Sequence, residues 1–133
     1  MTSLTLSHAL LDEMLARVAG LWPEEACGLV AGRDGRAVRL YPVENVHHSP
    51  VAYEMEPVQQ VRAMIAMEEE GLELIAIYHS HPHGPARPSP TDVANAYYPD
   101  AAQIIISLAD RQRPGVRAFT IAGGAVAEIA LRD

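Results

Sequence analysis

The sequence predicts an α/β fold in a single domain, with a mixed β-sheet flanked by helices. The 133 residues make one ordinary domain, and 49% apolar with 20% charged residues is the composition of a compact core. Helical periodicity and short apolar runs alternate along the chain in the order α-β-β-α-β-α-β-β-β, which is typical of helices packed on a mixed sheet. We therefore expect one domain over residues 1–133, without an internal repeat or linker.

The first helix is predicted from Ser7 to Val18, because apolar residues recur there at three- and four-residue spacing. Gly20 and Pro23 are expected to end it. Two antiparallel strands joined by a turn follow, at 26–31 and 37–43. A polar loop at 45–50 then passes into a short extended piece from Val51 to Met55.

The second half begins with a helix from Pro57, a residue suited to a first helical position, to the closing Gly71. The apolar run 72–78 has strand length and is expected at the centre of the sheet. Prolines make the next segment a loop, and Ser89 then caps a helix of about two turns that Pro99 stops. Three closing strands are predicted, at 103–108, 115–121 and 125–131.

Charge and composition exclude several classes of partner. The net charge is -7 and no basic stripe is present, so we expect no nucleic-acid partner. No apolar run approaches the ~20 residues of a membrane span, and Met1 to Leu11 lack the pattern of a signal peptide, so we expect no membrane partner and a cytoplasmic protein. Cys27 is the only cysteine, expected as a small buried residue, so a metal site within the chain must use histidines and carboxylates.

Two histidines stand out as candidate metal ligands. His79 and His81 lie two residues apart at the end of a predicted strand, where the period of two turns both imidazoles to one face. Two histidines and one carboxylate leave a tetrahedral metal one open position for water, as in catalytic zinc sites. Asp92 is the nearest carboxylate that the intervening loop can return to this spot, although Ser89 and Asp92 also have the spacing of a helix capping box.

The longer pattern carries a family resemblance. The residues H-S-H-P at 79–82, six further residues and S-P-T-D at 89–92 match the H-x-H-P-x6-S-x-x-D signature of the JAMM (MPN+) metalloproteases at every fixed position. Upstream, E-A-C-G-L-V-A-G at 25–32 resembles the strand that supplies the catalytic glutamate of that family.

The resemblance implies a role for each matching residue. His79, His81 and Asp92 would bind Zn²⁺ with a water as fourth ligand, Glu25 would be the base, and Ser89 would help to stabilise the oxyanion. The residues alone do not choose between Glu24 and Glu25, and only the family's E-x-C-G pattern selects Glu25.

The resemblance also implies a fold and an activity. The family has a curved mixed sheet with helices on both faces, shared with zinc deaminases, and hydrolyses peptide or isopeptide bonds. The short chain resembles the small prokaryotic members that act on ubiquitin-like sulfur-carrier proteins. It is therefore expected to cleave after the carrier's C-terminal Gly-Gly, to release cysteine or a lysine conjugate, and to pair the tail with residues 51–55. The oligomeric state stays open, with a homodimer as one alternative.

Other functions remain to be weighed against this one. A non-catalytic MPN scaffold would normally have lost its ligands, and a zinc deaminase needs a P-C-x-x-C pair of cysteines that this chain lacks. An iron oxygenase with two histidines and one carboxylate is formally compatible with the same ligand set. Six further residues are expected to have no role in a site. His47, His48 and His83 are expected to be exposed loop residues, and Met55, Met64 and Met67 are expected to lie in the core.

Overall fold

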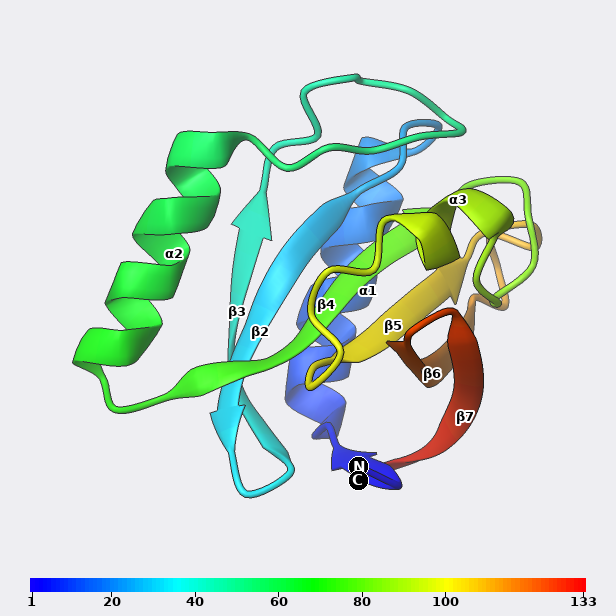
Figure 1. Cartoon of the computed structure of the whole chain (residues 1–133). Helices are drawn as coiled ribbons and strands as arrows, with labels where there is room; N and C mark the ends of the chain where they lie inside the picture. Colours follow the sequence, from blue (N-terminus) through cyan, green and yellow to red (C-terminus); the bar gives the residue numbers. More distant parts are fainter.

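A closed, seven-stranded sheet dominates the computed structural model, which describes all residues 1–133 (Figure 1). The elements, in chain order, are β1 (Ser3–Thr5), α1 (His8–Leu21), β2 (Cys27–Arg33), β3 (Arg36–Val43), α2 (Pro57–Glu69), β4 (Glu73–His81), α3 (Pro90–Ala94), β5 (Ala102–Ser107), β6 (Gly115–Ala122) and β7 (Ala125–Arg132). The strand order is β1-β3-β2-β4-β5-β6-β7, with parallel pairing at β4–β5 and on both sides of β1. The predicted α/β class with a mixed sheet is confirmed.

The two long helices cover opposite faces of this sheet (Figure 1). Side chains alternate along β2, so that Val30 joins the core cluster that contains Met14 and Val18 of α1. Its neighbour Leu29 instead joins the cluster that contains Ala63 and Met67 of α2. Helices on both faces, as the resemblance implied, are therefore confirmed.

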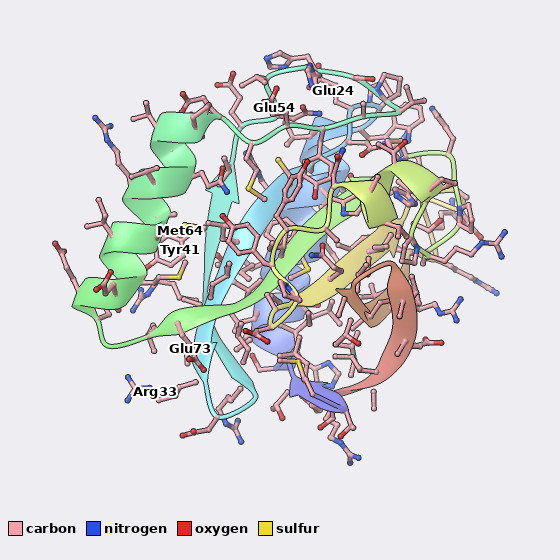
Figure 2. The ribbon with its side chains drawn as sticks, viewed as in Figure 1. Glu24, Arg33, Tyr41, Glu54, Met64 and Glu73 are labelled. Atoms are coloured by element: carbon pink, nitrogen blue, oxygen red, sulfur yellow. The ribbon has the colours of Figure 1, made fainter.

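The methionines lie in or against this core. Met55 and Met67 are buried, and Met64 packs against the cluster under α2 together with Tyr41. Figure 2 shows Met64 and Tyr41 beside each other between α2 and β3. The expectation of core methionines is confirmed.

Strand β1 was not predicted, and it is the strand that closes the sheet. Its three residues pair in parallel with β7, and Thr5 also pairs with Arg36 of β3. Three residues are too few to show a period of two, so only the sheet pairing reveals this strand. The curved mixed sheet expected from the family resemblance therefore closes into a barrel.

Two predicted helix ends are wrong. Helix α1 continues through Gly20 to Leu21, because that glycine lies in open space and Pro23 comes only after the helix end. Helix α3 covers five residues and does not reach Tyr98, because it has no buried residue. A short helix without an apolar face to pack is marginal in water.

Two neighbouring strands place the segments that matter for the site. Strand β4 extends to His81 and runs between β2 and β5 in the middle of the sheet. Residues 51–55 lie outside the sheet, and a single isolated bridge pairs Met55 with Asn45, two residues after the end of β3. None of the helices is long and apolar enough to cross a membrane.

Candidate metal centre

Three predicted ligands converge at the end of β4. The Nε2 atoms of His79 and His81 lie 3.0 Å apart, and Asp92 Oδ2 lies 3.2 Å from the first and 3.0 Å from the second. The side chain of His79 is 1% exposed, and those of His81 and Asp92 are 11% and 13% exposed. The structure thus brings the three side chains together in a site that is nearly closed to solvent.

The donor set fits a divalent metal ion. Nδ1 of His81 lies 2.8 Å from the carbonyl oxygen of Pro85, and because a carbonyl only accepts, Nδ1 carries a proton, which leaves Nε2 as the nitrogen that would give its lone pair to a metal. The 3.0–3.2 Å edges of the triangle are close to the roughly 3.3 Å between ligands of a tetrahedral zinc with bonds of about 2.0–2.1 Å. Burial lowers the pKa of His79, which favours the neutral imidazole that a metal requires.

The hydrogen bonds among the candidate ligands shift the pKa values of Asp92 and His81 in opposite directions. Burial acts to raise the pKa of Asp92, but the hydrogen bonds to His79 and His81 outweigh it and hold that pKa well below its usual range. Burial acts to lower the pKa of His81, and its hydrogen bonds to Asp92 and Pro85 raise it on balance. An anionic carboxylate between two imidazoles is a donor set that favours a cation.

The start of α3 fixes Asp92 through a capping box. Ser89 Oγ accepts from the backbone N–H of Asp92 at 3.1 Å, and Asp92 Oδ2 accepts from the backbone N–H of Ser89 at 2.9 Å. The capping box is therefore confirmed, and it is compatible with a candidate metal site because the same Oδ2 faces both imidazoles. The cap uses Ser89 Oγ only as an acceptor, so its proton remains available to donate.

Glu25 lies just before β2 and is buried, at 6% exposure. Ala26, the residue after Glu25, is held by the fully buried Ser80. Ser80 Oγ accepts from the Ala26 N–H at 2.9 Å, and the Ser80 N–H donates to the Ala26 carbonyl at 3.0 Å. Burial raises the pKa of Glu25 to about 7. Glu24 instead pairs with His48, at 3.2 Å, and its label in Figure 2 lies at the edge of the molecule.

A cleft of about 600 Å³ opens beside these residues. Glu25, His79, Ser89 and Asp92 all line it, which places the candidate base and oxyanion donor beside the candidate ligands. Its other walls come from the loop before α2, the start of α2, the segment after α3 and the strands β4 and β5. The lining residues include Tyr53, Met55, Gln60, Ile77, Tyr98 and Gln103. This volume is that of a site for a small molecule or an extended peptide.

The remaining histidines and the cysteine lie outside the ligand triangle. His47, His48 and His83 are exposed, as expected, and of these His47 also lines the cleft. Cys27 is buried and burial raises its pKa to about 12, so its thiol is inert.

Several residues that shape the site were not predicted from the sequence. Ser80 stands inside the motif, but its bonds to Ala26 depend on the pairing of β2 with β4. Asn45 and Tyr53 lie in segments without periodicity, and the Pro85 carbonyl carries no side-chain signal. Asn45 differs from the other loop residues in being both polar and buried, and its burial cannot be seen in the sequence because it depends on the fold.

Comparison with known proteins identifies the family. The sequence model for prokaryotic homologues of the JAB domain matches residues 7–122. The chain belongs to the prokaryotic JAB-domain family. The JAMM/MPN resemblance read from the motif is therefore confirmed.

This JAB-domain chain has named relatives. A Thermus thermophilus protein described as a probable TtuB-protein conjugate cleaving protease is 43% identical over 122 residues, which are 91% of this chain and 78% of that protein. The CysO-cysteine peptidase of Mycobacterium tuberculosis is 37% identical over 94% of this chain and 87% of the relative. The desampylase of Haloferax volcanii is 39% identical over 80% of this chain and 84% of the relative. These matches make the JAB-domain chain a hydrolytic enzyme.

Solved structures agree with the fold. A solution structure from Desulfitobacterium hafniense has a TM-score of 0.87 at 39% identity, covering 96% of this JAB-domain chain and 90% of the other. A structure described as showing the metalloprotease-like JAMM zinc site of the proteasome and signalosome has a TM-score of 0.61, with 99% and 100% coverage. At 18% identity, the second match establishes a common fold alone.

Proposed function

We propose that this protein is a zinc metallopeptidase that cleaves the bond after the C-terminal Gly-Gly of a ubiquitin-like sulfur-carrier protein. The observation that supports it most is the triangle of His79, His81 and Asp92 donor atoms in one cleft with the buried Glu25. Relatives named for the cleavage of TtuB conjugates and of CysO-cysteine support the class of substrate. The leaving amine would be that of cysteine or of a conjugated lysine.

The proposed chemistry assigns one task to each side chain. His79, His81 and Asp92 would hold the zinc, which when bound lowers the pKa of a water to ~7 and polarises the scissile carbonyl. Glu25 would accept the proton from the attacking water and deliver it to the leaving amine, a task for a carboxylate that lines the same cleft without being one of the proposed ligands. The Ser89 hydroxyl would donate to the developing oxyanion. Every residue of this proposal comes from one chain, so it requires no homodimer.

The segment before α2 supports the proposed mode of tail binding. Tyr53 lines the cleft, and neither its backbone N–H nor its carbonyl forms a hydrogen bond within the chain. An extended tail could therefore pair with this segment as an added strand, and glycines would let the two backbones approach closely.

Metal content and single substitutions test the assignment of the site. We expect about one zinc per chain in the purified protein, and loss of that zinc in His79→Ala. Zinc rather than iron in protein purified without added metal also separates a peptidase from an oxygenase. Undiminished zinc in His79→Ala would refute the proposed ligand set.

The adjacent glutamates provide a matched pair for the base. Glu25→Gln should retain zinc and lose most turnover, because the proposed base moves a proton without holding the metal. Glu24→Gln should remain active, since Glu24 pairs with His48. An inactive Glu24→Gln beside an active Glu25→Gln would reverse the assignment, and full activity in both would show that neither glutamate is the base. A zinc-loaded wild type without turnover would favour a non-catalytic scaffold.

A carrier with an altered tail tests the substrate. Replacing the penultimate glycine of a small β-grasp carrier by a bulky residue should reduce turnover sharply while the carrier's folded body still binds. Equal turnover of that variant, or of unrelated unfolded peptides, would show a general peptidase.

A further inference from the structure

Asn45 uses its whole amide group in the loop that forms one wall of the cleft. Its Nδ2 donates to the carbonyls of Glu25 and Ala52, both at 3.0 Å. Its Oδ1 accepts from the N–H groups of His47, at 3.0 Å, and Glu54, at 3.2 Å. Because carbonyls only accept and N–H groups only donate, the orientation of this amide is unambiguous. The side chain is also buried, with the residue 5% exposed.

These four bonds connect the two halves of the proposed site. One bond reaches the backbone of the candidate base, Glu25. Two others hold Ala52 and Glu54, the residues on either side of Tyr53. The position of the Tyr53 ring therefore depends on the same amide that fixes the backbone of Glu25.

Tyr53 in turn contacts a proposed metal ligand. Its ring stacks on the His79 imidazole with centroids 4.7 Å apart and an interplanar angle of 30°. A ligating histidine usually has its second ring nitrogen held by a hydrogen bond, but Nδ1 of His79 is buried and has no partner. The stacked Tyr53 ring is thus one of the contacts that orient this imidazole, together with those of its Nε2 to His81 and Asp92.

We propose that Asn45 is a positioning residue that couples the two halves of the site, holding Glu25 through its backbone and His79 through the ring of Tyr53. This inference rests on the metal site of the proposed function. It assigns to the 45–55 loop a second task, beyond binding the tail of a substrate.

The substitution Asn45→Asp isolates the relevant bonds. A carboxylate still accepts from the N–H groups of His47 and Glu54, but it cannot donate to the carbonyls of Glu25 and Ala52. Gln59→Glu is the matched control, because the exposed Gln59 accepts from the N–H of Glu44 at 2.8 Å and a carboxylate can do the same. Tyr53→Ala removes the stacked ring, and Tyr53→Phe keeps it.

Zinc affinity, measured by competition with a chromophoric chelator, tests the coupling without any substrate. Asn45→Asp and Tyr53→Ala should bind zinc about 10–100-fold more weakly than the wild type, the usual effect of losing support for a ligand. Tyr53→Phe and Gln59→Glu should bind within a few-fold of the wild type. Wild-type affinity in both Asn45→Asp and Tyr53→Ala would overturn the proposal, as would an equal loss in Gln59→Glu. If the buried charge of Asn45→Asp prevents folding, Asn45→Ala replaces it, since it lacks both donors and adds no charge.

Proton NMR of the metal-free protein separates this proposal from the proposed function. The ring of Tyr53 should shift the His79 ring resonances upfield, and this shift should disappear in Asn45→Asp and Tyr53→Ala but persist in Gln59→Glu. Its persistence in Asn45→Asp would overturn the coupling. A wild type that binds no zinc, or cleaves no carrier, would refute the proposed function while this measurement still decides the role of Asn45.

Discussion

Glu25 shows how one buried side chain can matter to both stability and chemistry. The carboxyl lies in the cleft wall before β2, and burial raises its pKa to about 7. In the metal-free protein, ionising this buried carboxyl costs stability. Its contribution to the free energy of unfolding is present below the unfolded pKa near 4.5 and is lost as the pH rises through about 7.

Replacing Glu25 should therefore stabilise the metal-free protein at high pH. Relative to the wild type, Glu25→Gln should gain about 2 kcal/mol in free energy of unfolding between pH 5 and pH 8. Each pKa unit is worth about 1.4 kcal/mol, but part of the wild type's loss already occurs below pH 5, and water in the adjoining cleft screens some of the rest. Urea denaturation at the two pH values measures the difference, and the comparison cancels the titration of groups common to both proteins. A constant difference between pH 5 and pH 8 would contradict the raised pKa.

Ser89 combines a cap with a proposed catalytic hydroxyl, and two substitutions separate these roles. Ser89→Ala should cost about 1 kcal/mol as a lost N-cap, whereas Ser89→Gly should cost only a few tenths. If the hydroxyl stabilises the oxyanion, both should lower kcat by about 10²-fold. Thermal denaturation and steady-state kinetics on the pair give the answer, and turnover that follows stability alone would leave Ser89 as a cap only.

At the scale of elements, the hairpin of β2 and β3 requires a close backbone approach at Gly32. The register of the pair shifts between Ala31 and Gly32, and a Cβ on Gly32 would overlap the carbonyl oxygen of Arg36. A strand backbone cannot yield as a flexible side chain does. The glycine is therefore required by the bulge at this end of the hairpin.

Two glycine substitutions test this requirement. Gly32→Ala should lower the free energy of unfolding by about 2 kcal/mol or more, because the backbone of β3 must shift. Gly20→Ala in α1 should raise it by about 0.5–1 kcal/mol, since its new methyl group would meet nothing within 4 Å and alanine favours the helix. Chemical denaturation of both variants suffices, and similar effects in the two would refute the close approach at Gly32.

At the scale of the whole molecule, the candidate metal centre sits on parts that the fold holds in place without it. His79 and His81 belong to β4 in the middle of the closed sheet, and the capping box of α3 holds Asp92. Two core clusters, one on each face of the sheet, support these elements. The site is therefore preorganised, unlike a small zinc domain whose fold depends on its metal.

Metal removal should then abolish activity and preserve the fold. Dialysis against a chelator is expected to leave the far-UV circular dichroism unchanged. Tm should fall only as far as the loss of the zinc-binding free energy accounts for, and added zinc should restore activity. Unfolding on chelation would show that the metal is structural.

The sequence determined the order of the elements, with β1 as the exception, and the local features of the site. A period of two turns His79 and His81 to one face, and the Ser89–Asp92 spacing makes a capping box, because both depend on residues close in the chain. The family motif also selected Asp92 as the third ligand and Glu25 as the base, and the roles of all these residues remain predictions.

The tertiary structure decided what depends on contacts between distant segments. It closes the sheet through β1. It also ends α3 at Ala94, before the predicted Tyr98, because this helix has no buried residue. It turns Glu24 to His48 and buries Glu25, and it stacks Tyr53 on His79 while Asn45 forms hydrogen bonds to both neighbours of Tyr53. The physical reason is the same in each case: strand pairing and packing between remote segments set burial and side-chain partners, and no local pattern of residues records them.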